Sequence, residues 1–213
     1  MAGRTYRSPR REQAAADTRT AILDAAELLF VEHGYAGTTV NQVAAAASVA
    51  PNTVYATFGG KAQLVVALVE RAMDDPLIIA SLEDIATMSD GAQIISRVAS
   101  GTGATKRSQQ HTIVIMLDNA TADPMITAAV ERATTMLRQR FHRIAGRLAA
   151  VDALREGITP ARASAILWFY FGFSPWRELR GLGWSWKETE RWLTEQATNA
   201  LIDTQRLGTG PDR

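Results

Sequence analysis

The 213-residue chain has 46% hydrophobic residues, 21% charged residues and a formal net charge of +1 at pH 7. These values are ordinary for a globular protein that is long enough to bury a core, as one large domain or two small ones. Because cysteine is absent, disulfides and thiolate metal sites are excluded.

The composition predicts no metal, no cofactor and no membrane span. The three histidines, His33, His111 and His142, lie too far apart to show a metal-ligand spacing. No apolar run approaches the ~18–20 residues of a membrane helix. The charged N-terminus lacks the apolar core of a signal peptide. The sequence therefore predicts a cytoplasmic protein without a membrane partner.

The N-terminal segment is basic, since residues 1–11 contain Arg4, Arg7, Arg10 and Arg11 but no acid. Two interpretations remain open for this segment: a solvated, disordered tail, or a basic arm that contacts phosphates. Residues 1–15 are predicted to be a flexible basic arm.

The next residues predict two successive helices. Residues 18–34 place apolar side chains at helical spacing and end at Gly34, a natural helix stop. Thr39, followed three residues later by Gln42, fits a capping box, so a second helix is expected up to about Ala46.

A third, shorter helix is predicted over residues 51–58, with Pro51 at its first position and Gly59-Gly60 after its end. Two short helices joined by a turn of about four residues describe a helix-turn-helix, here over residues 39–58. A helix this short is marginal alone, so its apolar side chains must pack on neighbouring helices. The polar side chains then face outward and suit base edges and phosphates: Asn52, Thr53, Tyr55 and Thr57.

Lys61 begins the following helix, where the positive end of the helix dipole disfavours a cation. A phosphate at this position would meet both the lysine and free backbone N–H groups. The alternative interpretations are that Lys61 is simply solvated in a loop, and that Tyr55 is a surface tyrosine whose ring covers the core.

The remaining segments are also predicted to be helical. Asp75-Pro76 marks a boundary, and residues 77–106 have weak periodicity with a loop expected around Gly101–Ala104. Start signals and periodicity predict later helices around 113–120, over 124–151, over 160–173 and from Ser185 to about Arg206. No strand-like alternation competes, so the predicted class is all-α with about nine helices.

Residues 18–64 resemble the DNA-binding domain of the tetracycline-repressor (TetR) type of bacterial regulators. The matching residues keep the order and spacing of that family: Ala25-Ala26, Leu29-Phe30, Gly34, Thr38-Thr39, Val43-Ala44, Val49, Thr53, Tyr55, Phe58, Lys61 and Leu64. The C-terminal half resembles the family only in architecture, together with the pattern Ser174-Pro175, Gly183-Trp184 and Trp192.

The resemblance implies a three-helix DNA-binding domain at residues 16–76 and a helical ligand-binding and dimerisation domain at residues 77–207. It implies phosphate contacts from Thr39, Tyr55 and Lys61. It implies base or backbone contacts from Pro51, Asn52, Thr53 and Thr57. The full set of predicted DNA-contacting residues is Thr38, Thr39, Gln42, Pro51, Asn52, Thr53, Tyr55, Thr57 and Lys61.

Two residues depart from the family pattern. Ser48 replaces the usual turn glycine, and Ala50 replaces the usual serine at the cap of the third helix. A serine at positive φ costs on the order of 1 kcal/mol, and a missing cap costs about as much. We expect strain in this turn but intact packing.

In the C-terminal half, all five tryptophans lie between Trp168 and Trp192. A helix over 160–173 that is apolar all round must be buried all round, which predicts a homodimer with two helices from each chain at the interface. A single monomeric core is the alternative. Polar residues beside apolar ones predict a pocket for an unknown, partly apolar small molecule; the candidate ligand-binding residues are His111, Met116, Asn119, Trp168, Phe171 and Trp176.

The predicted function is a ligand-responsive transcriptional repressor that binds a palindromic operator in double-stranded DNA as a homodimer and is released by a small molecule. A helical small-molecule-binding or interaction protein without DNA binding is the alternative. An enzyme is not predicted, because the sequence shows no clustered histidine and carboxylate and no phosphate-binding glycine loop.

Overall fold

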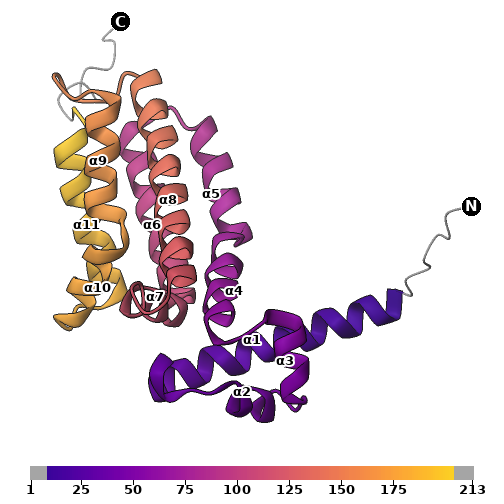
Figure 1. The fold of residues 1–213 in the computed structure, drawn as a ribbon. Coiled ribbons are helices and arrows are strands. Elements are labelled where there is room, and N and C mark those ends of the chain that lie inside the picture. Colours follow the sequence, from indigo (N-terminus) through magenta and orange to yellow (C-terminus); the bar gives the residue numbers. More distant parts are fainter. Residues whose placement is uncertain (1–8, 204–213) are drawn as a thin grey trace, which may run out of the picture. The chain divides into compact units, whose positions relative to one another are not determined.

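The computed structural model describes residues 9–203, and within them the predicted all-α class is confirmed (Figure 1). The described residues form eleven helices, a finer division than the expected nine or so. They are α1 (Pro9–Gly37), α2 (Val40–Ala46), α3 (Pro51–Phe58), α4 (Lys61–Met73), α5 (Pro76–Thr87), α6 (Gly91–Ser108), α7 (Gln110–Asp118), α8 (Pro124–Ala150), α9 (Pro160–Phe171), α10 (Phe173–Gly181) and α11 (Trp186–Leu201).

The helices belong to two compact units that do not follow the chain order. The N-terminal unit ends at Met73 but also includes His111–Val130, and the C-terminal unit holds the rest. The single boundary expected near residue 76 is therefore wrong for residues 111–130. Ile115 and Ile126 are buried in the core of the N-terminal unit, which explains why this later segment belongs to it.

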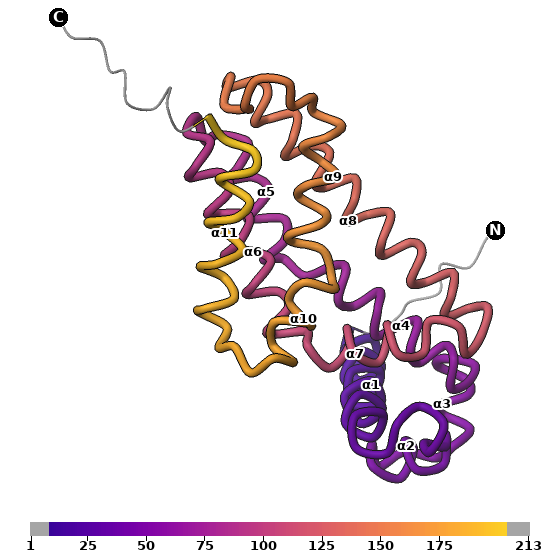
Figure 2. The backbone as a smooth tube through the Cα atoms, turned by 90° about the vertical axis from the view of Figure 1, so that its left-hand side faces the viewer, coloured from indigo at the N-terminus to yellow at the C-terminus, as the bar shows by residue number. Residues whose placement is uncertain are grey.

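The N-terminal unit is built around α1, which packs against α2 and α4, while α2 packs against α3 (Figure 2). Its core joins Ile22, Ala26 and Phe30 of α1 to Val54 and Phe58 of α3. The short helices α2 and α3 are thus held by burial of their apolar side chains, as expected from the sequence.

The first helix begins earlier than the sequence predicted. Residues 9–15 were expected in a flexible arm, but they form the first turns of α1. Proline at the first position and the alanine run that follows both favour a helix. These preferences outweigh the polar composition of residues 9–15, which suggested a flexible segment. Arg4 and Arg7 of the predicted arm lie outside the described residues.

The C-terminal unit is a helical bundle in which α6 packs against α5, α9 and α11 (Figure 1). Its core contains the largest fully buried side chains of this unit, among them Phe141, Phe171, Trp176 and Leu193. The predicted start signals are used here: Thr159 caps α9, and Ser185 with Glu188 forms the capping box of α11. The last helix ends at Leu201, earlier than expected.

The loop expected around Gly101–Ala104 is wrong, because α6 runs through it without a break. The two glycines allow close packing instead of ending the helix. A Cβ on Gly101 would lie 2.6 Å from Ser81 Oγ of α5, and one on Gly103 would lie 2.6 Å from the Trp176 ring of α10. Glycine at these positions lets neighbouring elements approach the α6 backbone.

Replacing Gly103 with alanine should therefore destabilise the protein. Pushing a methyl against the buried Trp176 ring costs about 1–3 kcal/mol, more than the roughly 1 kcal/mol that alanine gains in helix propensity. Gly146 of α8 is the matched control, since a Cβ there meets nothing within 4 Å. Chemical denaturation should show Gly103→Ala less stable and Gly146→Ala more stable than wild type. An equal gain for both variants would contradict the packing explanation.

Candidate nucleic-acid interface

Thr39 and Gln42 form the capping box that starts α2. The Thr39 backbone N–H donates to Gln42 Oε1 at 2.8 Å, and the Gln42 backbone N–H donates to Thr39 Oγ1 at 3.2 Å. Both side chains are exposed, so they remain accessible to a phosphate, but their first task is to fix the start of the helix.

Thr38, which was predicted to contact DNA, is instead buried. It is 1% exposed, and its hydroxyl donates to the carbonyl oxygens of Gly34 at 2.8 Å and Leu29 at 3.1 Å. These carbonyls lie near the C-terminal end of α1, where helix carbonyls lack partners within the helix. Thr38 therefore ties α1 to the start of α2 and offers no surface contact. The sequence could not separate it from its exposed neighbour Thr39.

The turn between α2 and α3 carries the strain that the sequence predicted. Ser48 has φ 55°, in the left-handed region that favours glycine. Its N–H donates to Ala45 O at 3.1 Å, and that of Val49 donates to Ala44 O at 2.9 Å, the pattern of a Schellman motif. Ala50 precedes α3 without a side-chain hydrogen bond to the helix.

The outer face of α3 presents polar groups, as predicted. Val54 and Phe58 are buried, whereas Asn52 is exposed and Tyr55 is 51% exposed. Pro51 is exposed at the first position, and Thr53 and Thr57 are partly buried at one side. The helix therefore offers amide, hydroxyl and phenol groups on a surface fixed from behind, the arrangement that a groove-reading helix needs.

Lys61, in the first turn of α4, is already engaged within the protein. Its Nζ donates to Tyr35 O at 2.7 Å and lies 4.3 Å from the centre of the Tyr35 ring. These contacts with the end of α1 offset the unfavourable position of a cation at a helix N-terminus. Two ammonium hydrogens remain for a phosphate. The pKa of Tyr35 is raised by burial and by the nearby charge of Asp123.

A second polar cluster links three helices of the N-terminal unit. Arg71 of α4 donates to Asp24 Oδ1 at 2.6 Å and to Glu27 Oε2 at 2.8 Å, both on α1. The other oxygen of Glu27 accepts a bond from Thr112 Oγ1 of α7 at 2.7 Å. One carboxylate of α1 therefore holds both α4 and α7. Its partners lie 44 and 85 residues away, and sequence reasoning missed this connection.

The six candidate ligand-binding residues fall in different units. His111, Met116 and Asn119 belong to the N-terminal unit, and Trp168, Phe171 and Trp176 to the C-terminal unit. His111 is exposed, Met116 is buried, and Asn119 donates to Ile115 O at 2.8 Å. Phe171 and Trp176 fill the core of the C-terminal unit, while Trp168 is partly buried with the Arg138 guanidinium 4.8 Å from its ring centre.

The C-terminal unit also buries a lysine that the sequence did not mark. Lys106 is 6% exposed, and its Nζ donates to Phe171 O at 2.9 Å, a carbonyl at the end of α9. Burial lowers the pKa of Lys106 to about 7 because desolvation disfavours the charged form. Among the described residues, the buried Trp176 Nε1 and Thr189 Oγ1 in this unit have no hydrogen-bond partner. Nothing in the local sequence separates Lys106 from its exposed neighbour Arg107.

Neither a metal site nor a membrane span is found in the described part of the chain. No group of three or more His, Cys, Asp or Glu residues could hold a metal ion between residues 9 and 203. No helix within that range is long and apolar enough to cross a membrane.

Comparisons with known proteins agree with this geometry. Residues 22–68, which include α2 and α3, match the sequence model of the tetR family of bacterial regulatory proteins. A search of the curated proteins found no match.

Similar solved structures include SmeT bound to triclosan (TM-score 0.73, 24% identity, 92% of this chain and 98% of that one). NalD, the secondary repressor of the MexAB-OprM multidrug efflux pump in Pseudomonas aeruginosa, is also similar (TM-score 0.70, 24% identity, 89% and 99%). The regulator FadR from Bacillus subtilis in complex with stearoyl-CoA shares the fold at 17% identity (TM-score 0.71, 85% and 98%).

Together, a fixed helix-turn-helix with a polar outer face and an attached helical bundle define a DNA-binding regulator. Residues 22–68 match the model of the tetR family of bacterial regulatory proteins, and the chain shares its fold with solved regulators such as SmeT and NalD.

The strained turn gives a direct stability test. Ser48→Gly should raise the free energy of unfolding by about 0.5–1 kcal/mol, because the left-handed conformation costs a serine roughly 1–2 kcal/mol and glycine gives back part of this in entropy. Ala47, at φ −81° in the same turn, is the matched control, and Ala47→Gly should destabilise. Chemical denaturation measures both. A destabilised Ser48→Gly would show that the serine side chain stabilises the turn.

The buried lysine predicts a pH-dependent stability. The pKa of Lys106 is about 7 in the folded protein, against an ordinary value of 10.5. Between these values the unfolded chain binds more protons, so the contribution of this lysine to stability rises from about pH 7 upward and is constant below it.

The free energy of unfolding of wild type and of Lys106→Met would be measured between about pH 6 and pH 9. The stability of wild type relative to the variant should increase as the pH rises. Arg107→Met, an exposed neighbour, should show no such pH-dependent difference. If Lys106→Met also keeps a constant difference from wild type, the lysine is charged throughout this range.

Proposed function

We propose that this protein is a transcriptional repressor that binds a palindromic operator as a homodimer and leaves it when a small molecule binds. The observation that carries the proposal is the outer face of α3, where Asn52 and Tyr55 are exposed on a helix held by buried Val54 and Phe58. With α3 in the major groove of each half-site, a two-fold dimer reads sites separated by about one helical turn or a multiple of it. Such a regulator acts in the cytoplasm, where the chromosome lies, and needs no catalytic residue.

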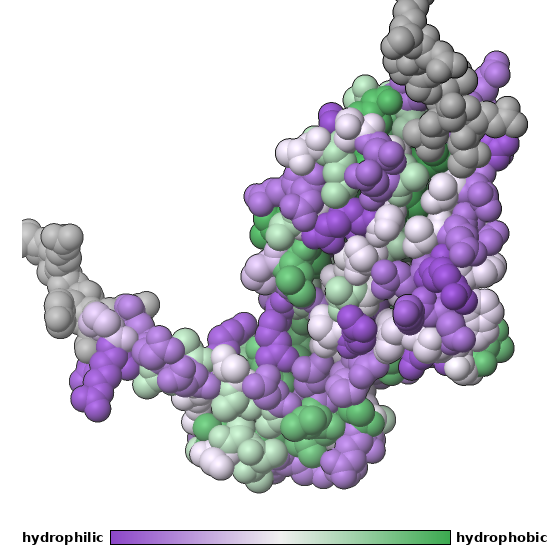
Figure 3. Space-filling model, turned by 180° about the vertical axis from the view of Figure 1, so that it is seen from behind, coloured by the Kyte–Doolittle hydropathy of each residue, from purple (hydrophilic) through white to green (hydrophobic). Residues whose placement is uncertain are grey.

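Exposed aromatic side chains on α9 and α11 support the homodimer. Phe169 is 67% exposed and Trp192 is 37% exposed, and their helices pack together. On the one face that Figure 3 shows, hydrophobic residues reach the surface in patches among hydrophilic ones. Other apolar residues of α11, Leu193, Ala197 and Leu201, are buried in the core of this chain and are not available to a partner. The partner would therefore cover Phe169 and Trp192.

The effector is proposed to be a partly apolar small molecule that binds the C-terminal unit. This bundle combines an aromatic core with polar groups that lack partners within the described residues, Trp176 Nε1 and Thr189 Oγ1, the mixture that ligand sites use. The solved relatives support an apolar effector, since SmeT is seen with triclosan and FadR with stearoyl-CoA.

Two positions connect the DNA-binding helices to the rest of the chain. Arg71 lies in the last turn of α4 just before the chain enters the C-terminal unit, and Thr112 lies just after it returns. Both are bonded to Glu27 of α1. A ligand that shifts the equilibrium of α4 would change the distance between the two α3 helices of the dimer.

DNA binding tests the proposal directly. The full-length protein and duplex DNA from the region flanking its own gene would be titrated over a salt series. Tyr55→Ala should cost about 1.5–3 kcal/mol per subunit if the phenol bonds a phosphate, and Tyr55→Phe should lose most of the same energy. Leu182→Ala, at a residue 74% exposed in the C-terminal unit, is the control and should bind as wild type does.

The outcome also separates the alternatives. Tight, site-specific binding with a steep salt dependence supports the regulator. No binding, or binding without sequence preference, would favour a helical interaction or small-molecule-binding protein that has lost DNA recognition.

A further inference from the structure

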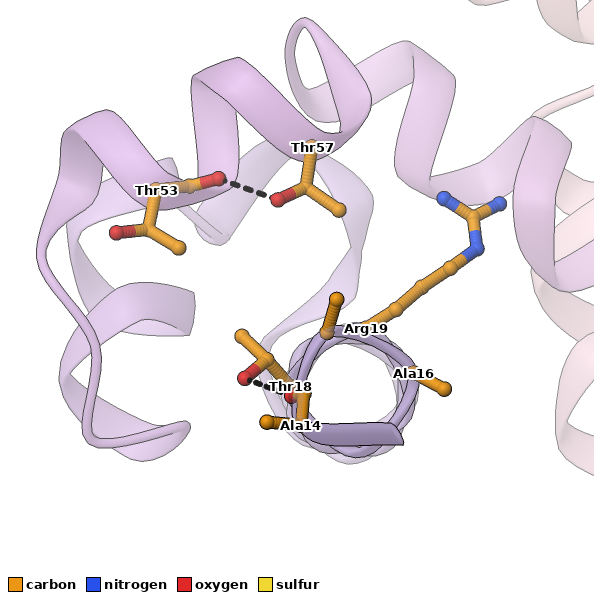
Figure 4. Close-up of a pocket in the computed structure, with 7 residues that line it drawn as sticks. Ala14, Ala16, Thr18, Arg19, Thr53 and Thr57 are labelled. Atoms are coloured by element: carbon orange, nitrogen blue, oxygen red, sulfur yellow. Dashed lines mark hydrogen bonds between the residues drawn. The ribbon is translucent and has the colours of Figure 1, made fainter. Parts of the chain in front are cut away.

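A groove opens between the first half of α1 and one side of α3, the helix proposed to enter the major groove of DNA (Figure 4). Its volume is about 570 Å³. The lining residues are small apart from one arginine: Ala14, Ala15, Ala16, Thr18, Arg19, Thr53 and Thr57. The first half of α1 can form one wall of the groove because this helix begins at Pro9.

Methyl groups dominate this surface because two of its three hydroxyl groups are turned to their own helices. Thr18 Oγ1 donates to Ala14 O at 2.8 Å, and Thr57 Oγ1 donates to Thr53 O at 2.7 Å (Figure 4). The Thr53 hydroxyl makes no hydrogen bond within the described residues and remains available. The groove is therefore apolar along its walls, with one free hydroxyl on the α3 side.

Positive charge lies at the edges of the groove. The Arg19 guanidinium is held 4.3 Å from the centre of the Phe58 ring. Arg11 is exposed and precedes Ala15 and Thr18 by four and seven residues, which places it on the same face of α1. Glu12 precedes Ala16 by four residues and Arg19 by seven, so one acid lies on this face as well, although neither Arg11 nor Glu12 lines the groove itself. Asp17 accepts a bond from Gln13 Nε2 at 2.8 Å.

We propose that this groove seats one sugar–phosphate strand of the bound DNA, making the first half of α1 a second DNA-contacting element. Deoxyribose rings are apolar and would lie against the alanine and threonine methyl groups. Phosphates would meet Arg11, Arg19 and the Thr53 hydroxyl. Thr53 and Thr57 belong both to the groove and to α3, so a strand in the groove is continuous with the duplex that α3 reads. The inference rests on the proposed DNA-binding function.

Two substitutions on α1 test the groove. Ala15→Glu places a negative charge in it, and Gln13→Glu places the same charge on α1 outside the lining; both keep a strong helix former. The probe is a duplex enriched from a random pool by the wild-type protein. Ala15→Glu should weaken binding by roughly tenfold or more at low salt because a carboxylate repels the phosphates. Gln13→Glu should change affinity much less. Arg19 is left intact because it also packs on Phe58.

Salt dependence and footprinting locate the contact. Arg11→Gln removes one phosphate contact per subunit, so the slope of log affinity against log salt should fall by about 2 per dimer. Arg162→Gln, an exposed arginine of α9, should leave the slope unchanged. Hydroxyl-radical footprints should lose protected sugars beside each half-site in Ala15→Glu. Thermal melting of each variant verifies that it is folded.

The groove assignment and the proposed function fail in different ways. If the wild type enriches a duplex but Ala15→Glu and Gln13→Glu bind and footprint alike, the groove holds no strand and α3 reads DNA without it. If the wild type enriches no duplex at all, the proposed function fails and the groove assignment with it.

Discussion

The DNA-facing surface depends on one constraint: α2 and α3, with seven and eight residues, are too short to be stable helices alone. Their shape comes from burial of Val43, Val54 and Phe58 in a core shared with α1 and α4. Because these side chains carry the stability, the outer residues of α3 are free to be polar. The same constraint explains why a strained Ser48 and an uncapped α3 are tolerated, since the packing of the motif does not rely on the turn alone.

Local chemistry made much of this fold predictable. The pairs Thr39–Gln42 and Ser185–Glu188 form capping boxes, and Thr159 caps α9, because each signal acts within one helical turn. The positive φ of Ser48 and the missing cap at Ala50 also follow from positions in the motif. The polar face of α3 is likewise local, because which side of so short a helix is buried follows from Val54 and Phe58 alone.

Sequence predictions failed where a tertiary contact determines whether a residue is buried or how it packs. Gly101 and Gly103 looked like helix breakers, yet α5 and α10 pack against them, and only the tertiary structure gives those glycines a packing role. Thr38 and Thr39 are adjacent in sequence, but the carbonyls at the end of α1 bury only the first. Lys106 is buried by α9 and α10 while Arg107 is exposed. In each case the residue type is uninformative. For the two glycines and Lys106 the deciding residue lies tens of positions away, and for Thr38 the accepting carbonyls lie four and nine residues before it.

The return of residues 111–130 to the N-terminal unit has the largest consequence for function. The chain leaves this unit after Met73, re-enters at His111 and leaves again inside α8. Arg71 lies close to the point where the chain leaves the unit, and Thr112 close to the point where it re-enters. These two side chains bond different oxygens of the same Glu27 carboxylate. Close to the point where the chain leaves the unit again, inside α8, Ile126 is fully buried in the core that also holds α3. The points where the chain leaves and re-enters this unit are therefore attached to α1 or to its core, and not to α4 alone. Since α3 has no stability of its own, its position follows that core, so these attachment points help to fix where α3 lies within the N-terminal unit.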